Sequence, residues 1–98
     1  MNIDKSLQGK KLTLSIAGRL DTVTAPELEK EIKASLGGVE ELVMDFKNLD
    51  YVSSAGLRVL LMAQKTMNAQ GSMKVINVSD TINEIFEVTG FSDILTIE

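Results

Sequence analysis

The chain has 98 residues, of which 44% are hydrophobic and 24% are charged, as is usual for one soluble globular domain. Its formal net charge is −4, and its ten Lys and Arg residues are scattered along the sequence, so we expect no nucleic acid among its partners. Because it contains no cysteine and no histidine, disulfides, thiolate nucleophiles, imidazole bases and Cys/His zinc sites are excluded.

The N-terminal segment after Met1 is polar and has no signal-peptide pattern. No apolar run approaches the roughly 20 residues that a membrane-spanning helix requires. We therefore expect a cytoplasmic protein without direct membrane insertion.

Two strands are predicted near the N-terminus, over residues 3–7 and 11–17, joined at Gln8-Gly9-Lys10. In the second strand, apolar residues alternate with polar ones, which is typical of a strand with one buried face: Leu12, Leu14 and Ile16. The segment therefore predicts a β-hairpin.

The first helix is predicted to begin near Thr24, where Thr24 and Glu27 have the spacing of a capping box. Apolar residues follow at helical spacing, namely Leu28, Ile32 and Leu36. Gly37-Gly38 is expected to end this helix.

The second half of the chain alternates strand and helix patterns. A short apolar strand is predicted over residues 41–46, and residues 47–52 connect it to a helix over about residues 55–69. A strand over 73–78 follows, then a helix capped by Ser79-Asp80 and closed by Gly90, and a last short strand over 94–97. The predicted order, ββαβαβαβ, indicates an α/β domain with a mixed sheet and crossover helices.

A pair of serines stands where a strand gives way to the second helix. Ser54 is expected at or beside the N-cap, where a hydroxyl can accept backbone N–H groups and the helix dipole tolerates an added anion. A phosphate on Ser54 would then change the surface without disrupting the fold. The simpler interpretation is that Ser53 and Ser54 only start a helix well.

Three segments of the chain resemble the STAS family of bacterial anti-sigma-factor antagonists. They are residues 51–57 (YVSSAGL), residues 18–28 (GRLDTVTAPEL) and residues 42–46 (LVMDF). The resemblance covers nearly the whole chain in order, so it implies one STAS domain over residues 1–98 and a fold of the kind that the patterns predict.

The resemblance also implies roles for individual residues. Ser54 aligns with the phosphorylated serine of the family, and Ser53, where many members carry Asp, is a minor alternative acceptor. Asp21 matches a residue of the partner surface, although simple turn chemistry explains an Asp there equally well. Asp45 is interpreted as a structural residue that binds loop amides near the serines.

Helical periodicity extends the expected partner surface along the second helix. One face carries the predicted core residues, namely Leu57, Leu60, Ala63 and Met67 with Val59 at its edge, and the other carries Arg58, Met62, Lys65 and Ala69. An exposed Met beside the serines is suited to docking. The expected partner-binding residues are Asp21, Thr22, Ser53, Ala55, Gly56, Arg58 and Met62.

The function implied by the resemblance is regulatory and not enzymatic. Unphosphorylated, the protein would bind a serine-kinase anti-sigma factor and release a sigma factor, and phosphorylation would end that binding. The implied partners are this kinase, which uses ATP and magnesium, and a PP2C-type phosphatase. We expect no cofactor in this chain and a monomer when it is free.

Other functions are weaker alternatives. A constitutive docking or scaffold subunit of a transporter or signalling complex would use the same surface without a switch. Gly56 alone is a poor signal for nucleotide binding, and no base accompanies the carboxylates for an enzyme. The acidic pairs Glu27/Glu31 and Glu40/Glu41 are interpreted as solvated faces without chemistry.

Overall fold

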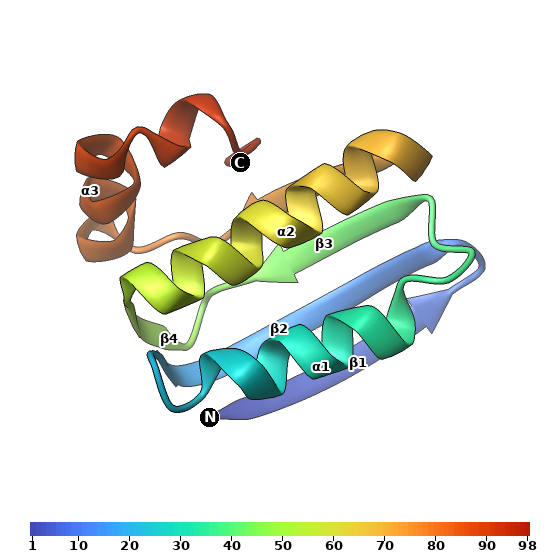
Figure 1. The fold of residues 1–98 in the computed structure, drawn as a ribbon, viewed down its shortest axis with the longest axis horizontal. Coiled ribbons are helices and arrows are strands. Elements are labelled where there is room, and N and C mark those ends of the chain that lie inside the picture. Colours follow the sequence, from blue (N-terminus) through green and yellow to red (C-terminus); the bar gives the residue numbers. More distant parts are fainter.

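The computed structural model describes all 98 residues. In chain order its elements are β1 (Asn2–Gln8), β2 (Lys11–Leu20), α1 (Ala25–Ser35), β3 (Glu41–Asp45), β4 (Leu49–Val52), α2 (Ser54–Gln70), β5 (Ser72–Ile76), α3 (Asp80–Thr89) and the short 3-10 helix η1 (Phe91–Asp93) (Figure 1). The predicted hairpin and the three predicted helices are all present.

One mixed sheet has the order β1, β2, β3, β5. β1 and β2 are antiparallel, whereas β3 pairs in parallel with both β2 and β5. β2 is long enough to pair twice on the same side, because residues 11–15 pair with β3 and residues 18–20 pair with β4. The predicted α/β class, with a mixed sheet and crossover helices, is confirmed.

Two details differ from the predicted strands. β4 lies in the stretch predicted as a connection. Its buried Leu49 and Val52 flank two exposed residues, so the sequence shows no alternation of period two that would predict a strand. The predicted strand over 94–97 is reduced to one bridge between Val75 and Ile97, since η1 and the turn after it occupy the residues just before Leu95.

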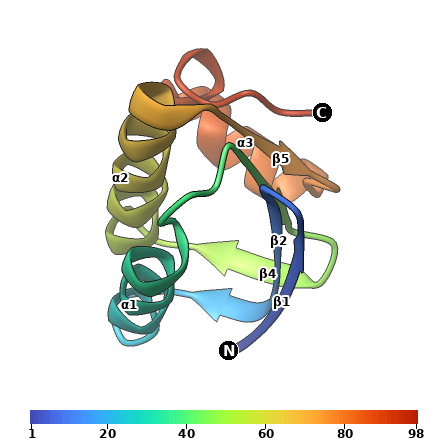
Figure 2. The same cartoon turned by 90° about the vertical axis from the view of Figure 1, so that its right-hand side faces the viewer.

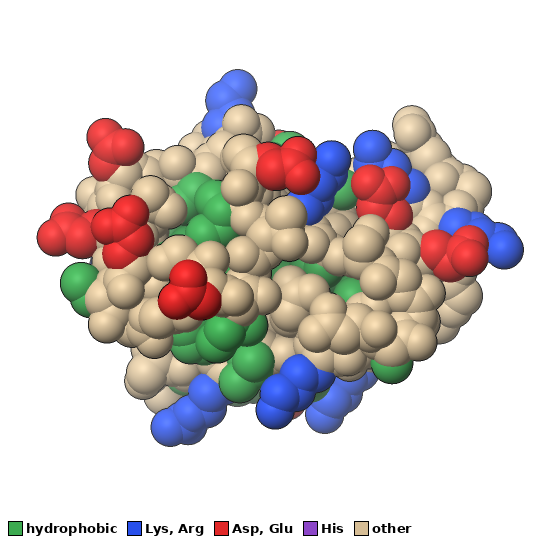
Figure 3. Space-filling view, turned by 90° about the horizontal axis from the view of Figure 1, so that it is seen from above, with side chains coloured by type: hydrophobic (Ala, Val, Ile, Leu, Met, Phe, Trp, Pro, Cys, Tyr) green, Lys and Arg blue, Asp and Glu red, His purple; other side chains and the backbone are tan.

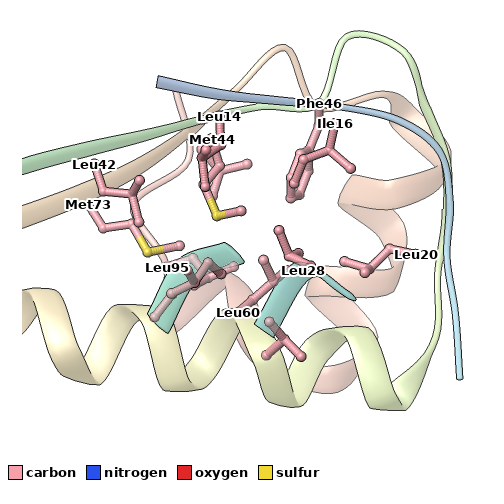
Figure 4. Close-up of a cluster of buried hydrophobic side chains, with 14 of the residues drawn as sticks. Leu14, Ile16, Leu20, Leu28, Leu42, Met44, Phe46, Leu60, Met73 and Leu95 are labelled. Carbon is pink, nitrogen blue, oxygen red and sulfur yellow. The ribbon is translucent and has the colours of Figure 1, made fainter. Parts of the chain in front are cut away.

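The core lies between the sheet and the helices. α1 and α2 run side by side over one face of the sheet, and α3 packs against β4 (Figures 1 and 2). Leu12, Leu14 and Ile16 of β2 are each at most 1% exposed, as their alternation predicts. Figure 4 shows part of the apolar cluster, in which side chains of the sheet meet Leu28 of α1 and Leu60 of α2.

The helix ends agree with the sequence except at Thr24. Ser79 caps α3 by accepting a hydrogen bond from the Ile82 amide at 3.3 Å, and Gly90 ends it in the left-handed conformation. The predicted capping box of Thr24 is wrong. Its hydroxyl instead donates to the Arg19 carbonyl at 2.7 Å and accepts from the Asp21 amide at 2.9 Å, so it serves the preceding turn.

Candidate functional site

The two serines differ in what their hydroxyl groups do. Ser53 is the N-cap of α2, and its Oγ accepts a hydrogen bond from the Gly56 amide at 3.3 Å. Ser54 is the first residue of the helix, is exposed, and its hydroxyl forms no hydrogen bond within the chain. The predicted place of Ser54 beside the N-cap is confirmed, and of the two it presents the free hydroxyl.

The sheet brings the serines next to the loop that contains Asp21. Leu20 pairs with Val52 at the end of β2 and β4, and the Ser53 amide donates to the Leu20 carbonyl at 2.8 Å. Asp21 follows Leu20 directly. These two loops therefore meet at one end of the sheet.

Asp21 organises the turn between β2 and α1. Its Oδ1 accepts hydrogen bonds from the amides of Val23 at 3.0 Å and Thr24 at 3.1 Å. The Thr24 amide holds the pKa of the Asp21 carboxyl below its ordinary value, and the Val23 amide, the Thr24 hydroxyl and the charge of Arg19 act in the same direction. The turn chemistry of Asp21 is thus present, and contact with a partner stays a prediction.

Gly56 packs against the protein's own backbone. It is buried, and a Cβ added there would lie 2.7 Å from Leu20 Cγ and 3.1 Å from the Leu20 carbonyl oxygen. A side chain at this position would collide with Leu20. β2 of the protein itself thus covers Gly56, and contact of this residue with a partner stays a prediction.

Arg58 lies in a groove between α1 and α2. The hollow at the start of the two helices is lined by residues of both and of the loop before α1, namely Thr22, Ala25, Pro26, Glu29, Ala55, Arg58 and Val59. Thr22 and Arg58 are exposed, and Ala55 is half-buried.

Val59, predicted at the edge of the core face of the second helix, is buried because α1 lies alongside it. The four predicted core residues of α2 are buried as expected.

Met62 is only partly exposed. It is half-buried, packs against the core cluster and lines a second hollow at the other end of the two helices, with Ile32 of α1 and Leu36, the residue that caps the end of α1. The sequence could not show this, because the position of α1 decides which residues of α2 are covered. Met62 therefore belongs to the interface between α1 and α2, and its contact with a partner stays a prediction.

Three further residues at this end were not predicted. The Arg19 guanidinium lies over the Tyr51 ring, 4.4 Å from its centroid, and Arg19 Nε is 3.7 Å from Asp21 Oδ2. Val23, in the same loop as Asp21, is 84% exposed. Val23 had one signal in the sequence, since it is an apolar residue outside any periodic pattern.

Asp45 binds loop amides elsewhere in the molecule. Its Oδ1 accepts from the Lys47 amide and from Asn77 Nδ2, both at 3.0 Å. Asp45 pairs with Ser15, five residues before Leu20 along β2. The predicted structural role is confirmed, but the predicted place near the serines is wrong.

The acidic pairs contribute ion pairs and no metal centre. Glu31 binds Lys5 Nζ at 2.9 Å, and the hydrogen bonds from Lys5 and Ser35 lower the pKa of its carboxyl. Glu40 pairs with Lys10 at 3.3 Å. No group of three acidic side chains in the protein could hold a metal ion, and none of its helices is long and apolar enough to cross a membrane.

Charge is unevenly distributed over the fold. All ten Lys and Arg residues lie at or before Lys74, so α3 and the segment after it carry only acidic charges, on Asp80, Glu84, Glu87, Asp93 and Glu98. Figure 3 shows acidic side chains gathered at the α3 end of the molecule. Arg19 and Arg58 are the basic residues beside the serines.

The family model of the STAS domain matches residues 2–98. The chain belongs to the STAS family. Among curated STAS relatives, the anti-sigma-B factor antagonist of Staphylococcus aureus is 29% identical over 99 residues, which covers 99% of this chain and 92% of that protein. The BtrV protein of Bordetella bronchiseptica is 35% identical over 88 residues, covering 88% of this chain and 76% of that protein.

Solved STAS structures have the same fold. The anti-sigma factor antagonist SpoIIAA in its unphosphorylated form superimposes with a TM-score of 0.78 at 18% identity, covering 99% of this chain and 87% of that chain. An anti-sigma factor antagonist from Mycobacterium paratuberculosis superimposes with a TM-score of 0.88 at 22% identity, covering 98% and 83%. At such identities the likeness concerns the fold alone.

Proposed function

We propose that this STAS protein is a phosphorylation-switched antagonist of an anti-sigma factor. Unphosphorylated, it binds a serine-kinase anti-sigma factor that uses ATP and magnesium, and so releases a sigma factor. Phosphorylation of Ser54 ends this binding, and a PP2C-type phosphatase restores it. The names of the curated relatives, which match this chain along nearly its whole length, support the antagonist function. The protein acts by binding and not as an enzyme.

One observation carries the assignment of Ser54. Its hydroxyl is exposed and free, whereas the Ser53 hydroxyl holds the N-cap hydrogen bond to Gly56. A kinase that modified Ser53 would have to break that cap. Ser53 is therefore the minor alternative acceptor.

The partner surface of this proposal surrounds Ser54. It comprises the predicted residues at this end of α1 and α2 that are exposed or half-buried, namely Asp21, Thr22, Ser53, Ala55 and Arg58, and we add Val23 and Tyr51 because of their exposure. Met62 lines the hollow at the other end of the two helices. A phosphate adds about −1.5 to −2 charges and three acceptor oxygens. Within a partner interface such a group must be desolvated or paired, so it opposes docking unless a basic site receives it.

A pull-down from lysate of the source organism tests the proposal. Tagged wild-type protein should capture an ATP-binding kinase of the anti-sigma type, and Ser54→Asp should lose it. The matched control is Ser6→Asp, which adds the same charge on the exposed strand β1. If Ser54→Asp captures the same partners as the wild type, or if the partner is a transporter subunit, the protein is a constitutive docking module instead.

A further inference from the structure

A cationic side chain without an ion pair lies one helical turn after Ser54. Arg58 follows Ser54 by four residues, and at this spacing two side chains are neighbours on a helix face, with Cβ atoms about 6 Å apart. The Arg58 side chain is exposed and takes part in none of the five ion pairs of the protein. It is also the first basic residue of α2, since the next is Lys65.

The carboxylates near Arg58 have other partners. Glu29 of α1 lines the same groove, but its carboxylate lies 3.8 Å from Lys33 Nζ. Asp21, in the loop before α1, lies beside Arg19. A new anion on Ser54 would therefore meet a guanidinium that no carboxylate holds.

We infer that the phosphate of phosphorylated Ser54 binds Arg58 of the same chain and draws its guanidinium out of the groove between α1 and α2. This inference rests on the proposed function, which makes Ser54 the acceptor. Side chains of a helix are tilted toward its N-terminus, so the Arg58 side chain can turn toward a phosphate on Ser54 without a change in the backbone. The guanidinium can donate two parallel hydrogen bonds to phosphate oxygens, and the positive end of the helix dipole favours the same anion.

The pairing gives phosphorylation a second effect on the partner surface. The modification adds negative charge at Ser54, and it also withdraws a positive charge from the groove that Thr22, Ala55 and Glu29 line. A partner that contacts Arg58 would lose that contact even if its own surface tolerated the phosphate. The switch would then act over an area wider than one residue.

The test is a 31P NMR titration of protein with phosphoserine installed at position 54 during translation, so that no kinase is needed. Because a nearby cation favours the dianion, the pKa of the phosphate should be higher in Arg58→Ala than in the wild type, by about 0.3 or more. Arg58→Lys should restore part of the difference. Lys47→Ala is the matched control, since Lys47 is exposed, has no ion pair and should leave the phosphate unchanged.

A second signal reports on the guanidinium itself. Phosphorylation should shift the Nε–H resonance of Arg58 more than that of Arg19, the only other arginine. An equal phosphate pKa in the wild type and in both Arg58→Ala and Arg58→Gln would overturn the pairing. If the pull-down fails while the titration behaves as expected, the proposed function is lost and the pairing stands.

Discussion

The amide of Ser53 donates a hydrogen bond to the carbonyl of Leu20 across 2.8 Å, and this contact joins the two loops of the proposed switch. It continues the parallel pairing of β2 with β4 into the start of α2. Leu20 is fully buried, and Gly56 in the first turn of α2 packs against its side chain and its carbonyl. The backbone beneath Ser54 is therefore anchored to the core, so we expect phosphorylation to change the surface and leave the fold intact.

Gly56→Ala should destabilise the fold. The new Cβ meets Leu20 Cγ at 2.7 Å and the Leu20 carbonyl at 3.1 Å, and such overpacking costs about 1–3 kcal/mol. Gly37→Ala is the control, because nothing lies within 4 Å of its Cβ position. Urea unfolding of both variants should separate them, and equal stabilities would show that α2 can move away from β2 freely.

Replacing each serine by alanine should give different stabilities. Ser53→Ala removes the N-cap acceptor of the Gly56 amide and should cost about 1 kcal/mol of unfolding free energy. Ser54→Ala removes a free, exposed hydroxyl and should change it by less than about 0.5 kcal/mol. Thermal unfolding monitored by circular dichroism measures both. A larger loss for Ser54→Ala would mean that its hydroxyl has a structural role.

Asp21 should make stability depend on pH in a defined direction. Because hydrogen bonds from Thr24 and Val23 lower the pKa of its carboxyl in the folded state, its contribution is present above its ordinary value of 3.8 and is lost as the pH falls through the lowered value. When the pH is lowered from about 5 to about 2, the unfolding free energy of Asp21→Asn should therefore fall by less than that of the wild type. Urea unfolding across this range tests it. Parallel curves for the two proteins would refute the role of the ionised carboxylate.

Substitutions at Arg58 and at Met62 should change different properties, the first partner binding and the second folding stability. Arg58→Ala should leave the unfolding free energy within about 0.5 kcal/mol and weaken partner binding, because the side chain is exposed beside Ser54. Met62→Ala should cost about 1 kcal/mol of stability, less than at a fully buried site, because the half-buried side chain packs against α1 and the core. Calorimetric titration with the partner, together with melting curves, distinguishes the two. Wild-type affinity for Arg58→Ala would place recognition elsewhere on the domain.

The elements that sequence reasoning predicted well are those with a local pattern. Leu12, Leu14 and Ile16 alternate, and Ile82 and Phe86 of α3 follow a clear cap at Ser79, so periodicity sufficed for β2 and the helices. β4 was not predicted because four residues are too short to show a period, and its pairing depends on the length of β2.

The parts of the site that were missed depend on contacts between distant segments. Arg19 reaches Tyr51 only because the register of β2 with β4 sets them opposite each other. Met62 is covered, and Gly56 is buried, because α1 and β2 pack against α2. The motif around Ser54 was evident in the sequence, whereas the surface around it required the structure.

The most direct test of the proposed switch is the affinity of the purified anti-sigma factor for two forms of the protein, one unmodified and one with phosphoserine at position 54, measured by isothermal titration calorimetry. We expect the unmodified form to bind and the phosphorylated form to bind at least about 100-fold more weakly, since losing an interface anchor costs 2 kcal/mol or more and a desolvated charge adds to this cost. Melting curves of the two forms should nearly coincide. Equal affinities of the two folded forms would contradict the account.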